Sequence, residues 1–370
     1  MHAMPTFTPL DYQMMSRAIQ LARRGVYTTA PNPNVGCVIV CDGNIVGEGF
    51  HYRAGEPHAE VHALRMAGER ARGAVAYVTL EPCSHYGRTP PCAEGLIRAG
   101  VSKVICAMED PNPKVAGRGI TMLREAGIEV AVGLLEQDAL ALNPAFIKRM
   151  KTGMPYVQLK MAASLDGQTA LANGQSQWIT SDAARQDVQK YRAQAGAVLS
   201  TSRTVIDDDA SLNVRYDDLP AGVTAHYARQ DVRQPVRVIL DRQQNLLPTL
   251  KLFNTAGEVL VVSPQGDVAT KLAEDGHIDL ATTLAILANE HHIHHLWVEA
   301  GATLASALLK QRLVDELVIY LAPKLMGSDG RGLFGALGLD TMDQVIELDI
   351  QDVRPVGNDL RIVAKLKHKD

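Results

Sequence analysis

Three short motifs in the first hundred residues constrain the fold of this 370-residue chain more than any other feature. They are His58-Ala59-Glu60, Glu81-Pro82-Cys83 and Pro91-Cys92. One imidazole and two thiolates supply three zinc ligands and leave the fourth tetrahedral position for water, as in catalytic zinc sites. The fold must therefore bring His58, Cys83 and Cys92 together from rigid elements and a short loop.

The residue between the ligands indicates a class of chemistry. An H-x-E motif followed by P-C motifs is typical of zinc deaminases, in which zinc-bound hydroxide attacks a ring carbon that carries an amino group. Glu60 would take the proton of the water and return protons to the ring nitrogen and to the leaving ammonia. The spacing departs from the general pattern, because eight residues separate Cys83 from Cys92 instead of two.

Two other histidines leave alternatives open. His62 lies one helical turn after His58 and is a competing ligand, although two thiolates already complete the set. His85, between the cysteines, is the one good candidate for a fourth protein ligand, which would make the zinc purely structural. In the loop 84–91, His85 and Arg88 suit a phosphate group, with exposed loop charges as the alternative. Asn32, in the Asn32-Pro33-Asn34 turn, suits the edge of a heterocycle, with simple turn chemistry as the alternative.

The hydrophobic periodicity of the first half predicts alternating helices and strands, hence an α/β layer with mixed strand directions. Asp11 is expected to cap the first helix, Pro57 to open the second at its first position, and Asp42-Gly43 to turn a hairpin. The predicted helices are 11–24, 57–68, 92–100 and 117–127, and the predicted strands are 35–40, 45–49, 75–80, 101–108 and 128–132.

The length suits two domains, and the polar, basic stretch 148–155 (KRMKTGMP) is the expected boundary. We therefore expect a deaminase domain over 1–150 and a second α/β domain over 151–370. The strands predicted for the second domain are 156–162, 197–200, 236–241, 259–263, 295–299 and 316–321.

The amino-acid composition indicates where the protein is located and which kinds of partner it binds. There is no apolar run long enough to span a bilayer and no apolar leader at the N-terminus. Five cysteines, an odd and low number, indicate free thiols and a cytoplasmic protein. Residues 1–150 carry 15 Lys and Arg against 14 Asp and Glu, which is not the basic balance of a protein that binds a polynucleotide. A small-molecule substrate is favoured, with no nucleic acid and no membrane as partner.

Two features of the second half bear on ligands. The stretch 297–304 (WVEAGATL) predicts a strand, a turn of small residues and a helix whose free N–H groups suit a phosphate. No G-x-G-x-x-G motif follows a strand, so a Rossmann domain is not supported. Asp207, Asp208 and Asp209 are adjacent, and a solvated turn is favoured over a metal cluster.

With both halves in view, the chain closely resembles the bifunctional riboflavin-biosynthesis deaminase-reductases of bacteria over essentially its whole length. The eight-residue cysteine spacing belongs to the pattern of that family. The motifs that carry the resemblance are PNPNVG (31–36), HAEVHA (58–63), EPCSHYGRTPPC (81–92), DPNP (110–113), VAGRG (115–119), SLDG (164–167), SQWITS (176–181), VEAG (298–301) and APKL (322–325).

The resemblance implies a cytidine-deaminase-like three-layer α/β domain followed by a dihydrofolate-reductase-like domain. The first would deaminate 2,5-diamino-6-ribosylamino-4(3H)-pyrimidinone 5′-phosphate, and the second would reduce the ribosyl group of the product to ribityl with NADPH. It also implies one zinc per chain and a homo-oligomer, either a dimer or a tetramer.

Site residues follow from the same resemblance. His58, Cys83 and Cys92 would bind zinc and Glu60 would move protons. The deaminase substrate would contact Asn32, His51, His85 and Arg88. NADPH would contact Ala162, Trp178, Thr204, Asp208, Gly301, Ala302, Thr303 and Leu304, and the reductase substrate would contact Ser176, Arg192, Leu212, Arg215 and Glu299.

The chain departs from the family pattern at two places. Ala210 stands where the family usually has proline after the acidic residues, and Ala302 stands in a turn that usually reads Gly-Pro-Thr or Gly-Gly-Ser. We expect small changes in affinity from both. Two other hypotheses remain at this point: a polynucleotide deaminase, and a non-catalytic binding module with a structural zinc.

Overall fold

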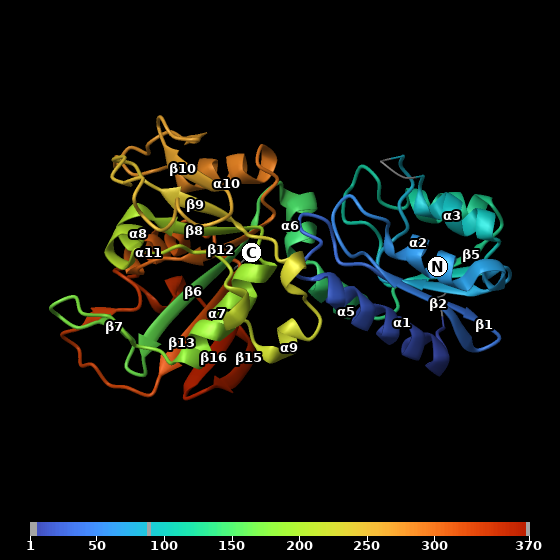
Figure 1. Cartoon of the computed structure of the whole chain (residues 1–370), viewed down its shortest axis with the longest axis horizontal. Helices are drawn as coiled ribbons and strands as arrows, with labels where there is room; N and C mark the ends of the chain where they lie inside the picture. The colour runs from blue at the N-terminus through green and yellow to red at the C-terminus, as the bar shows by residue number, and fades with distance from the viewer. Residues whose placement is uncertain (1–5, 87–89, 368–370) are drawn as a thin grey trace. The chain divides into compact units, whose positions relative to one another are not determined.

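The computed structural model describes residues 6–86 and 90–367. The chain forms two compact units, 1–153 and 154–370, each built around its own β-sheet (Figure 1). In the described ranges, no helix combines the length and the apolar character needed to cross a membrane.

The first unit is a three-layer α/β sandwich. Its five-stranded sheet has the order β2-β1-β3-β4-β5. The strands are β1 (Gly36–Cys41), β2 (Asn44–Phe50), β3 (Val75–Val78), β4 (Lys103–Cys106) and β5 (Glu129–Val132). The helices are α1 (Pro9–Ala22), α2 (Ala59–Ala67), α3 (Cys92–Ala99), α4 (Arg118–Glu125), α5 (Glu136–Leu142) and α6 (Pro144–Thr152), with 3-10 turns η1 (Arg23–Gly25) and η2 (Gly68–Ala71).

Alternate residues of each strand enter two different cores. Cys37 and Ile39 of β1 pack in the core under α2, α3 and α4, whereas Val38 and Val40 pack in the core under α1 and α5. Gly36 permits a close approach of α1, because a Cβ there would lie 1.9 Å from the carbonyl oxygen of Ala18. Two buried faces explain why these strands read as continuous apolar runs.

The strand directions are mixed, as predicted. β1 runs antiparallel to β2 and β3, whereas β3, β4 and β5 are parallel. The hairpin between β1 and β2 turns at Asp42-Gly43, where both residues have positive φ. A short antiparallel hairpin thus precedes βα units that carry the chain back and forth across the sheet.

Two predictions about helix starts are wrong. The first helix is capped by Thr8, and Asp11 is the reciprocal partner in a capping box: the Thr8 hydroxyl accepts from Asp11 N–H and the Asp11 carboxylate accepts from Thr8 N–H. Pro57 precedes the N-cap of α2, which is His58. The stretch 148–155, where the domain boundary was expected, is helical as far as Thr152, because α6 ends at Gly153 in a left-handed conformation.

The second unit is built on a nine-stranded sheet of order β11-β10-β9-β8-β12-β6-β13-β16-β15, and a separate ribbon pairs β14 with β7. The strands from β11 to β13 in this order are parallel, and β16 and β15 close the sheet antiparallel. The bounds are β6 (Tyr156–Ser164), β7 (Gln168–Ala170), β8 (Ala197–Thr201), β9 (Val236–Leu240), β10 (Val259–Ser263), β11 (Val268–Ala269), β12 (His295–Glu299), β13 (Glu316–Ala322), β14 (Arg331–Gly332), β15 (Leu348–Val356) and β16 (Asp359–Leu366).

Helices cover both faces of this sheet. Leu284 of α10 and Leu308 of α11 lie in one buried cluster with Leu159 and Val298, and Val188 of α7 and Val205 of α8 lie in another with Trp297. The arrangement is consistent with a dihydrofolate-reductase-like fold. The helices are α7 (Asp182–Gln194), α8 (Ser202–Asp208), α9 (Ala221–Thr224), α10 (Leu280–Asn289) and α11 (Ala302–Lys310), with 3-10 turns η3 (Tyr216–Asp218), η4 (Arg229–Asp231) and η5 (Met342–Gln344).

Candidate zinc and cofactor sites

The three predicted zinc ligands meet in the first unit. His58 Nδ1 lies 3.3 Å from Cys92 Sγ and 3.6 Å from Cys83 Sγ, and the three ligand atoms all lie within 4.8 Å of one another. With bonds of about 2.1 Å to nitrogen and about 2.3 Å to sulfur, tetrahedral ligands lie about 3.5–4 Å apart. The donor set and its spacing therefore fit a zinc ion.

Local structure explains the convergence. His58 is the N-cap of α2 but makes no side-chain capping bond, so its imidazole is available to the cysteines. Cys92 is the first residue of α3, after Pro91, and its N–H donates to Cys83 Sγ at 3.3 Å. Cys83 follows β3 on a short connection. The N–H at this helix N-terminus favours a thiolate at the Cys83 sulfur that it reaches, whereas the hydrogen bond with Cys83 and burial raise the pKa of Cys92.

The electrostatics of Cys83 and Glu60 match this assignment. Hydrogen bonds from Cys92 and His58 lower the pKa of Cys83 to about 4 against the opposing effect of burial. Glu60 is 3% exposed, and its Oε2 has no hydrogen-bond partner among the described residues. Burial raises the pKa of the Glu60 carboxyl, although the positive charge of His58 opposes this. A buried carboxyl with a free oxygen beside the ligands suits proton transfer to a substrate.

The alternative ligands are not brought into the cluster. The grouping of described residues that could hold a metal contains His58, Cys83 and Cys92, without His62 or His85. His85 is exposed on its loop, so the structure gives no fourth protein ligand there. Arg88 lies outside the described residues. Among the described residues, therefore, none supplies a fourth ligand, and a zinc held here would keep a position for water or substrate, as a catalytic zinc requires.

Two of the residues expected to contact the deaminase substrate are hydrogen-bonded to each other. His51 is 2% exposed, and its Nδ1 donates to the Pro57 carbonyl at 3.2 Å. This fixes Nε2 as an acceptor for Asn32 Nδ2, also at 3.2 Å. Burial lowers the pKa of His51, which favours the neutral form that this pattern needs. The His51 and His58 rings lie edge to face, 5.3 Å apart, so the pair borders the metal cluster.

In the second unit, Arg192 and Glu299 form a bidentate pair. Nε lies 2.6 Å from Oε1 and Nη2 lies 2.8 Å from Oε2. Trp297 Nε1 also donates to Glu299 Oε1, at 2.9 Å, and Arg192 Nη1 donates to the carbonyl of Asn213, at 3.0 Å. Arg192 and Glu299 were both predicted to contact the reductase substrate. Arg192 therefore links the end of β12 to the segment that carries Leu212 and Arg215.

That segment is held by further side chains. The N–H of Arg215 donates to Gln189 Oε1 at 2.9 Å, and the Arg215 guanidinium pairs with Asp218. Leu212 is buried at 3% exposure with positive φ, whereas Ser176 lies exposed on a separate loop. The predicted substrate residues thus come from two loops, from α7 and from the end of β12.

The predicted NADPH residues gather where parallel strands end. Ala162 lies near the end of β6, Thr204 follows β8 at the start of α8, and Gly301 follows β12. Carboxyl ends of parallel strands are where α/β sheets bind ligands. A Cβ built on Gly301 would meet nothing within 4 Å, and α11 has no side-chain cap, so the backbone from Gly301 through Ala302 and Thr303 to Leu304 is open to a phosphate.

The loop that carries Trp178 joins this edge of the sheet. The Trp178 side chain is 65% exposed, and the Arg185 guanidinium lies 4.4 Å from the centre of its ring. Lys324 Nζ donates to the Trp178 carbonyl at 2.8 Å, and Gln177 Nε2 donates to Asp208 Oδ1 at 3.1 Å. An exposed aromatic surface beside Asp208 suits a flat cofactor ring.

The three adjacent aspartates do not form the expected turn. Asp207 and Asp208 belong to α8, and Asp209 ends it in a left-handed conformation. Asp207 pairs with Arg203 at 2.6 Å and Asp209 with Lys251 at 3.1 Å, so the carboxylates are directed to different partners. Helical hydrogen bonding from the Thr201 N-cap prevails over the turn preference of the aspartates.

Sequence reasoning left Lys160 out of the site, although it lies beside Glu299 in the register of β6 and β12. Burial lowers the pKa of Lys160, while the carboxylates of Glu299 and Asp208 act to raise it. A lysine in an otherwise apolar strand next to predicted ligands was the available signal.

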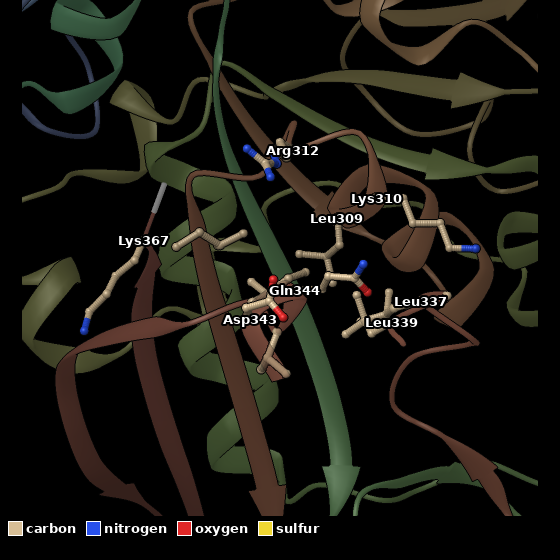
Figure 2. A pocket seen from close by; sticks show the side chains of 12 residues that line it. Leu309, Lys310, Arg312, Leu337, Leu339, Asp343, Gln344 and Lys367 are labelled. Carbon is tan, nitrogen blue, oxygen red and sulfur yellow. The ribbon is translucent and has the colours of Figure 1, made fainter. Parts of the chain in front are cut away.

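A cavity of about 350 Å³ lies away from this edge, against the C-terminal end of α11 (Figure 2). Leu309, Leu337 and Ile346 form part of its apolar lining, with Lys310 and Asp343 among the charged groups. Because Gly301 is at the opposite end of the same helix, this cavity is separate from the predicted cofactor position.

Comparison with known proteins identifies the family to which the chain belongs. The profile of the RibD C-terminal domain matches residues 155–362, and that of the cytidine and deoxycytidylate deaminase zinc-binding region matches residues 9–108. RibD of Escherichia coli is 53% identical over 359 residues, which cover 95% of this chain and 98% of that protein. The chain belongs to the RibD family. RibD of Haemophilus influenzae is 52% identical over 96% of this chain and 97% of its own length.

Solved structures of RibD proteins agree. Acinetobacter baumannii RibD superposes with a TM-score of 0.90 at 49% identity, covering 97% of this chain and 99% of that one. A Thermotoga maritima diaminohydroxyphosphoribosylaminopyrimidine deaminase/5-amino-6-(5-phosphoribosylamino)uracil reductase gives 0.83 at 33% identity with the same coverage. As a RibD protein, the chain is a bifunctional deaminase and reductase of riboflavin biosynthesis that uses zinc and NADPH. This decides against the polynucleotide deaminase and against the non-catalytic module.

Proposed function

We propose that the first unit deaminates 2,5-diamino-6-ribosylamino-4(3H)-pyrimidinone 5′-phosphate and that the second reduces the ribosyl side chain of the product with NADPH. The final product is 5-amino-6-ribitylamino-uracil 5′-phosphate. The observation that carries the first half is the convergence of His58, Cys83 and Cys92 beside the buried, unpartnered oxygen of Glu60. The full-length similarity to the Thermotoga protein supports the choice of substrates.

In the deaminase unit, His58, Cys83 and Cys92 would hold the zinc, which supplies a Lewis acid that makes water nucleophilic near neutral pH. Glu60 takes the proton from that water and delivers protons to the ring nitrogen and to ammonia. Its burial helps, because a carboxyl with a raised pKa holds a proton more readily near neutral pH.

The proposed substrate contacts of this unit fall into two groups, one for the pyrimidine ring and one for the phosphate. Because Asn32 Nδ2 is bound to His51, Asn32 Oδ1 is left to accept an N–H from the edge of the pyrimidine. The hydrogen bond to His51 Nε2 fixes the orientation of the Asn32 amide. His85 and Arg88, on the loop between the cysteines, are assigned to the substrate phosphate, for which the arginine fork is suited.

In the reductase unit, NADPH supplies the hydride. Ala162, Trp178, Thr204 and Asp208 would line it, with the turn 301–304 at a phosphate. Opposite them, Arg192 holds the Glu299 carboxylate in one orientation, and this carboxylate accepts a hydroxyl of the sugar. Ser176, Leu212 and Arg215 complete the proposed substrate contacts.

We also propose a homo-oligomer, with a dimer as the simplest form, that pairs through the outer ribbon of the second unit. In the register of β15 and β16, Leu348, Ile350 and Val353 share one face with Leu360, and these side chains are between 38% and 61% exposed. A twofold axis would bury this apolar face against its own copy. Ile350→Lys should then yield a monomer in light scattering, whereas an unchanged mass would contradict the proposed dimer surface.

The free state of all five cysteines supports a cytoplasmic location.

The assignment is tested by incubating zinc-quantified protein with the diaminopyrimidine phosphate, with and without NADPH. Without NADPH, one equivalent of ammonia and the ribosyl product should form. With NADPH, the ribityl product should follow, with one equivalent of NADPH oxidised. In the reaction with NADPH, release of ammonia without any ribityl product would contradict the reductase activity, and reduction without ammonia would contradict the proposed order.

A further inference from the structure

We propose that Glu81 is a positioning residue of the deaminase site, whose buried carboxylate fixes the segment carrying Cys83 against residues 110–120. The proposal rests on the zinc-binding role of Cys83 proposed above. Glu81 lies after β3, two residues before Cys83, and is 6% exposed. It contacts neither substrate nor metal in this account and acts through its neighbours.

The carboxylate of Glu81 accepts four backbone N–H groups from one distant stretch of chain. Oε2 accepts from Asp110 at 3.0 Å and from Gly117 at 2.9 Å. Oε1 accepts from Gly119 at 2.8 Å and from Ile120 at 3.4 Å. Hydrogen bonds from N–H groups to an ionised carboxylate are stronger than neutral ones, and here they join both ends of a loop and the first turn of α4. One side chain therefore closes the loop 110–119.

The link from Glu81 to Cys83 is short and stiff. Pro82 stands between them, and its ring fixes one backbone dihedral. Beyond Pro82, the Cys83 carbonyl accepts from Ala93 N–H at 3.2 Å, and Cys83 Sγ accepts from Cys92 N–H at 3.3 Å. Cys83 is thus held downstream by the start of α3 and upstream by the Glu81 clamp.

Gly119 gives independent support for a close fit between the two segments. A Cβ on Gly119 would lie 2.0 Å from the Pro82 carbonyl oxygen and 3.2 Å from Glu81 Oε1. The first turn of α4 therefore packs directly on the backbone of the Glu81-Pro82-Cys83 motif, at a distance that only glycine allows. This approach places the N–H groups of α4 at the carboxylate.

The loop that Glu81 closes also borders the site. Asp110 N–H donates to the Glu81 carboxylate at one end of this loop, and burial raises the pKa of Asp110 while the charge of His85 acts to lower it. His85 is one of the proposed substrate contacts. Loosening the loop should consequently affect both the retention of zinc and the binding of substrate, whereas the reductase unit has no part in the clamp.

The test compares the full chain with Glu81→Gln, which keeps the length of the side chain but turns an amide NH₂ toward backbone N–H groups. Glu109→Gln is the matched control, because it removes the same charge from an exposed neighbour of the loop. Four quantities are measured: zinc content, zinc transfer to a colorimetric chelator, hydrogen exchange over 110–120, and kcat and KM for each activity.

For Glu81→Gln we expect zinc release at least about tenfold faster, faster exchange over 110–120, and a deaminase kcat/KM about 10- to 100-fold lower, as for other residues that orient metal ligands. Reductase turnover should stay within about twofold, and Glu109→Gln should match the parent chain. Parental zinc release and exchange in Glu81→Gln would overturn the proposal, as would an equal loss in Glu109→Gln.

A second variant covers the case in which Glu81→Gln does not fold. Glu81→Asp keeps the carboxylate but is one methylene shorter, so it can reach only part of the donor set, and zinc release should be intermediate. Parental zinc release in folded Glu81→Asp would overturn the proposal in that case. The parent chain distinguishes a failure of this proposal from a failure of the proposed function: if the parent binds no zinc, the proposed function fails, whatever the variants do.

Discussion

Arg192 and Glu299 face each other as a bidentate ion pair whose side chains are only 10% and 13% exposed. Burial alone would favour a neutral carboxyl, but the charge and hydrogen bonds of Arg192 lower the pKa of Glu299 to about 2. The pair joins α7 to the end of β12, where the proposed reductase ligands gather. It therefore supports the second unit as well as the substrate position.

Replacing the arginine should destabilise the second unit. Arg192→Leu leaves the Glu299 carboxylate buried without its charged partner, which costs about 3–5 kcal/mol of unfolding free energy. Both tryptophans, Trp178 and Trp297, lie in this unit, so their fluorescence in urea reports its unfolding alone. Arg203→Leu, which removes an exposed pair with Asp207, is the control and should cost less than about 1 kcal/mol. Equal losses in the two variants would contradict the role given to burial.

The second unit should lose stability in mild acid through His295. Burial lowers the pKa of His295 to about 4, from the usual value of 6.5. Between these two values the unfolded chain binds a proton that the folded chain does not, so unfolding becomes easier as pH falls from about 6.5 toward 4. The loss is about 2–3 kcal/mol across this window. Glu299 adds to the loss only at the acid end of this window, because its carboxyl takes up a proton in the unfolded chain as pH nears about 4.3, whereas the depressed pKa keeps the folded carboxylate ionised.

The measurement is urea unfolding, followed by tryptophan fluorescence at several pH values between 7 and 4.5. His295→Gln should flatten the dependence on pH, while His292→Gln, at an exposed position in the same connection, should leave it unchanged. An unaltered slope in His295→Gln would assign the acid sensitivity to other groups.

Zinc removal should affect the activity and stability of the first unit and leave those of the second unchanged. A chelator should abolish ammonia release and leave NADPH oxidation with the deaminated substrate within about twofold of the untreated enzyme. The first unit should also lose stability, by about 4 kcal/mol if zinc had been present at about a thousand times its dissociation constant. Calorimetry with and without zinc checks this, since only the transition of the first unit should move. A shift confined to the second unit would be inconsistent with the proposed ligands.

The sequence specifies the zinc cluster well because the chemistry is local. His58, Cys83 and Cys92 each lie next to a proline or at a helix start, so both the ligand type and its placement are visible in short motifs. The mixed sheet was also predictable, since its strands are buried on both faces and read as apolar runs. The resemblance to the family then extended the prediction to the second domain.

Other features depend on contacts that no local pattern reveals. The four N–H groups on Glu81 come from residues 29 to 39 positions away. The β15–β16 ribbon was missed because a bulge between Ile350 and Asp352 shifts the alternation of apolar residues in its outer strand by one position. Residues 148–152 look like a linker by composition, yet Pro144 starts a helix that continues through them.

Glu60→Gln tests both whether the two activities reside in separate units and whether Glu60 moves protons in the first. The variant should retain one zinc per chain and lose ammonia release by at least about a hundredfold, the low end of the contribution of a general acid–base group. NADPH oxidation with the deaminated substrate should persist near the parental rate. Ammonia release at a parental rate from the zinc-loaded variant would contradict the account.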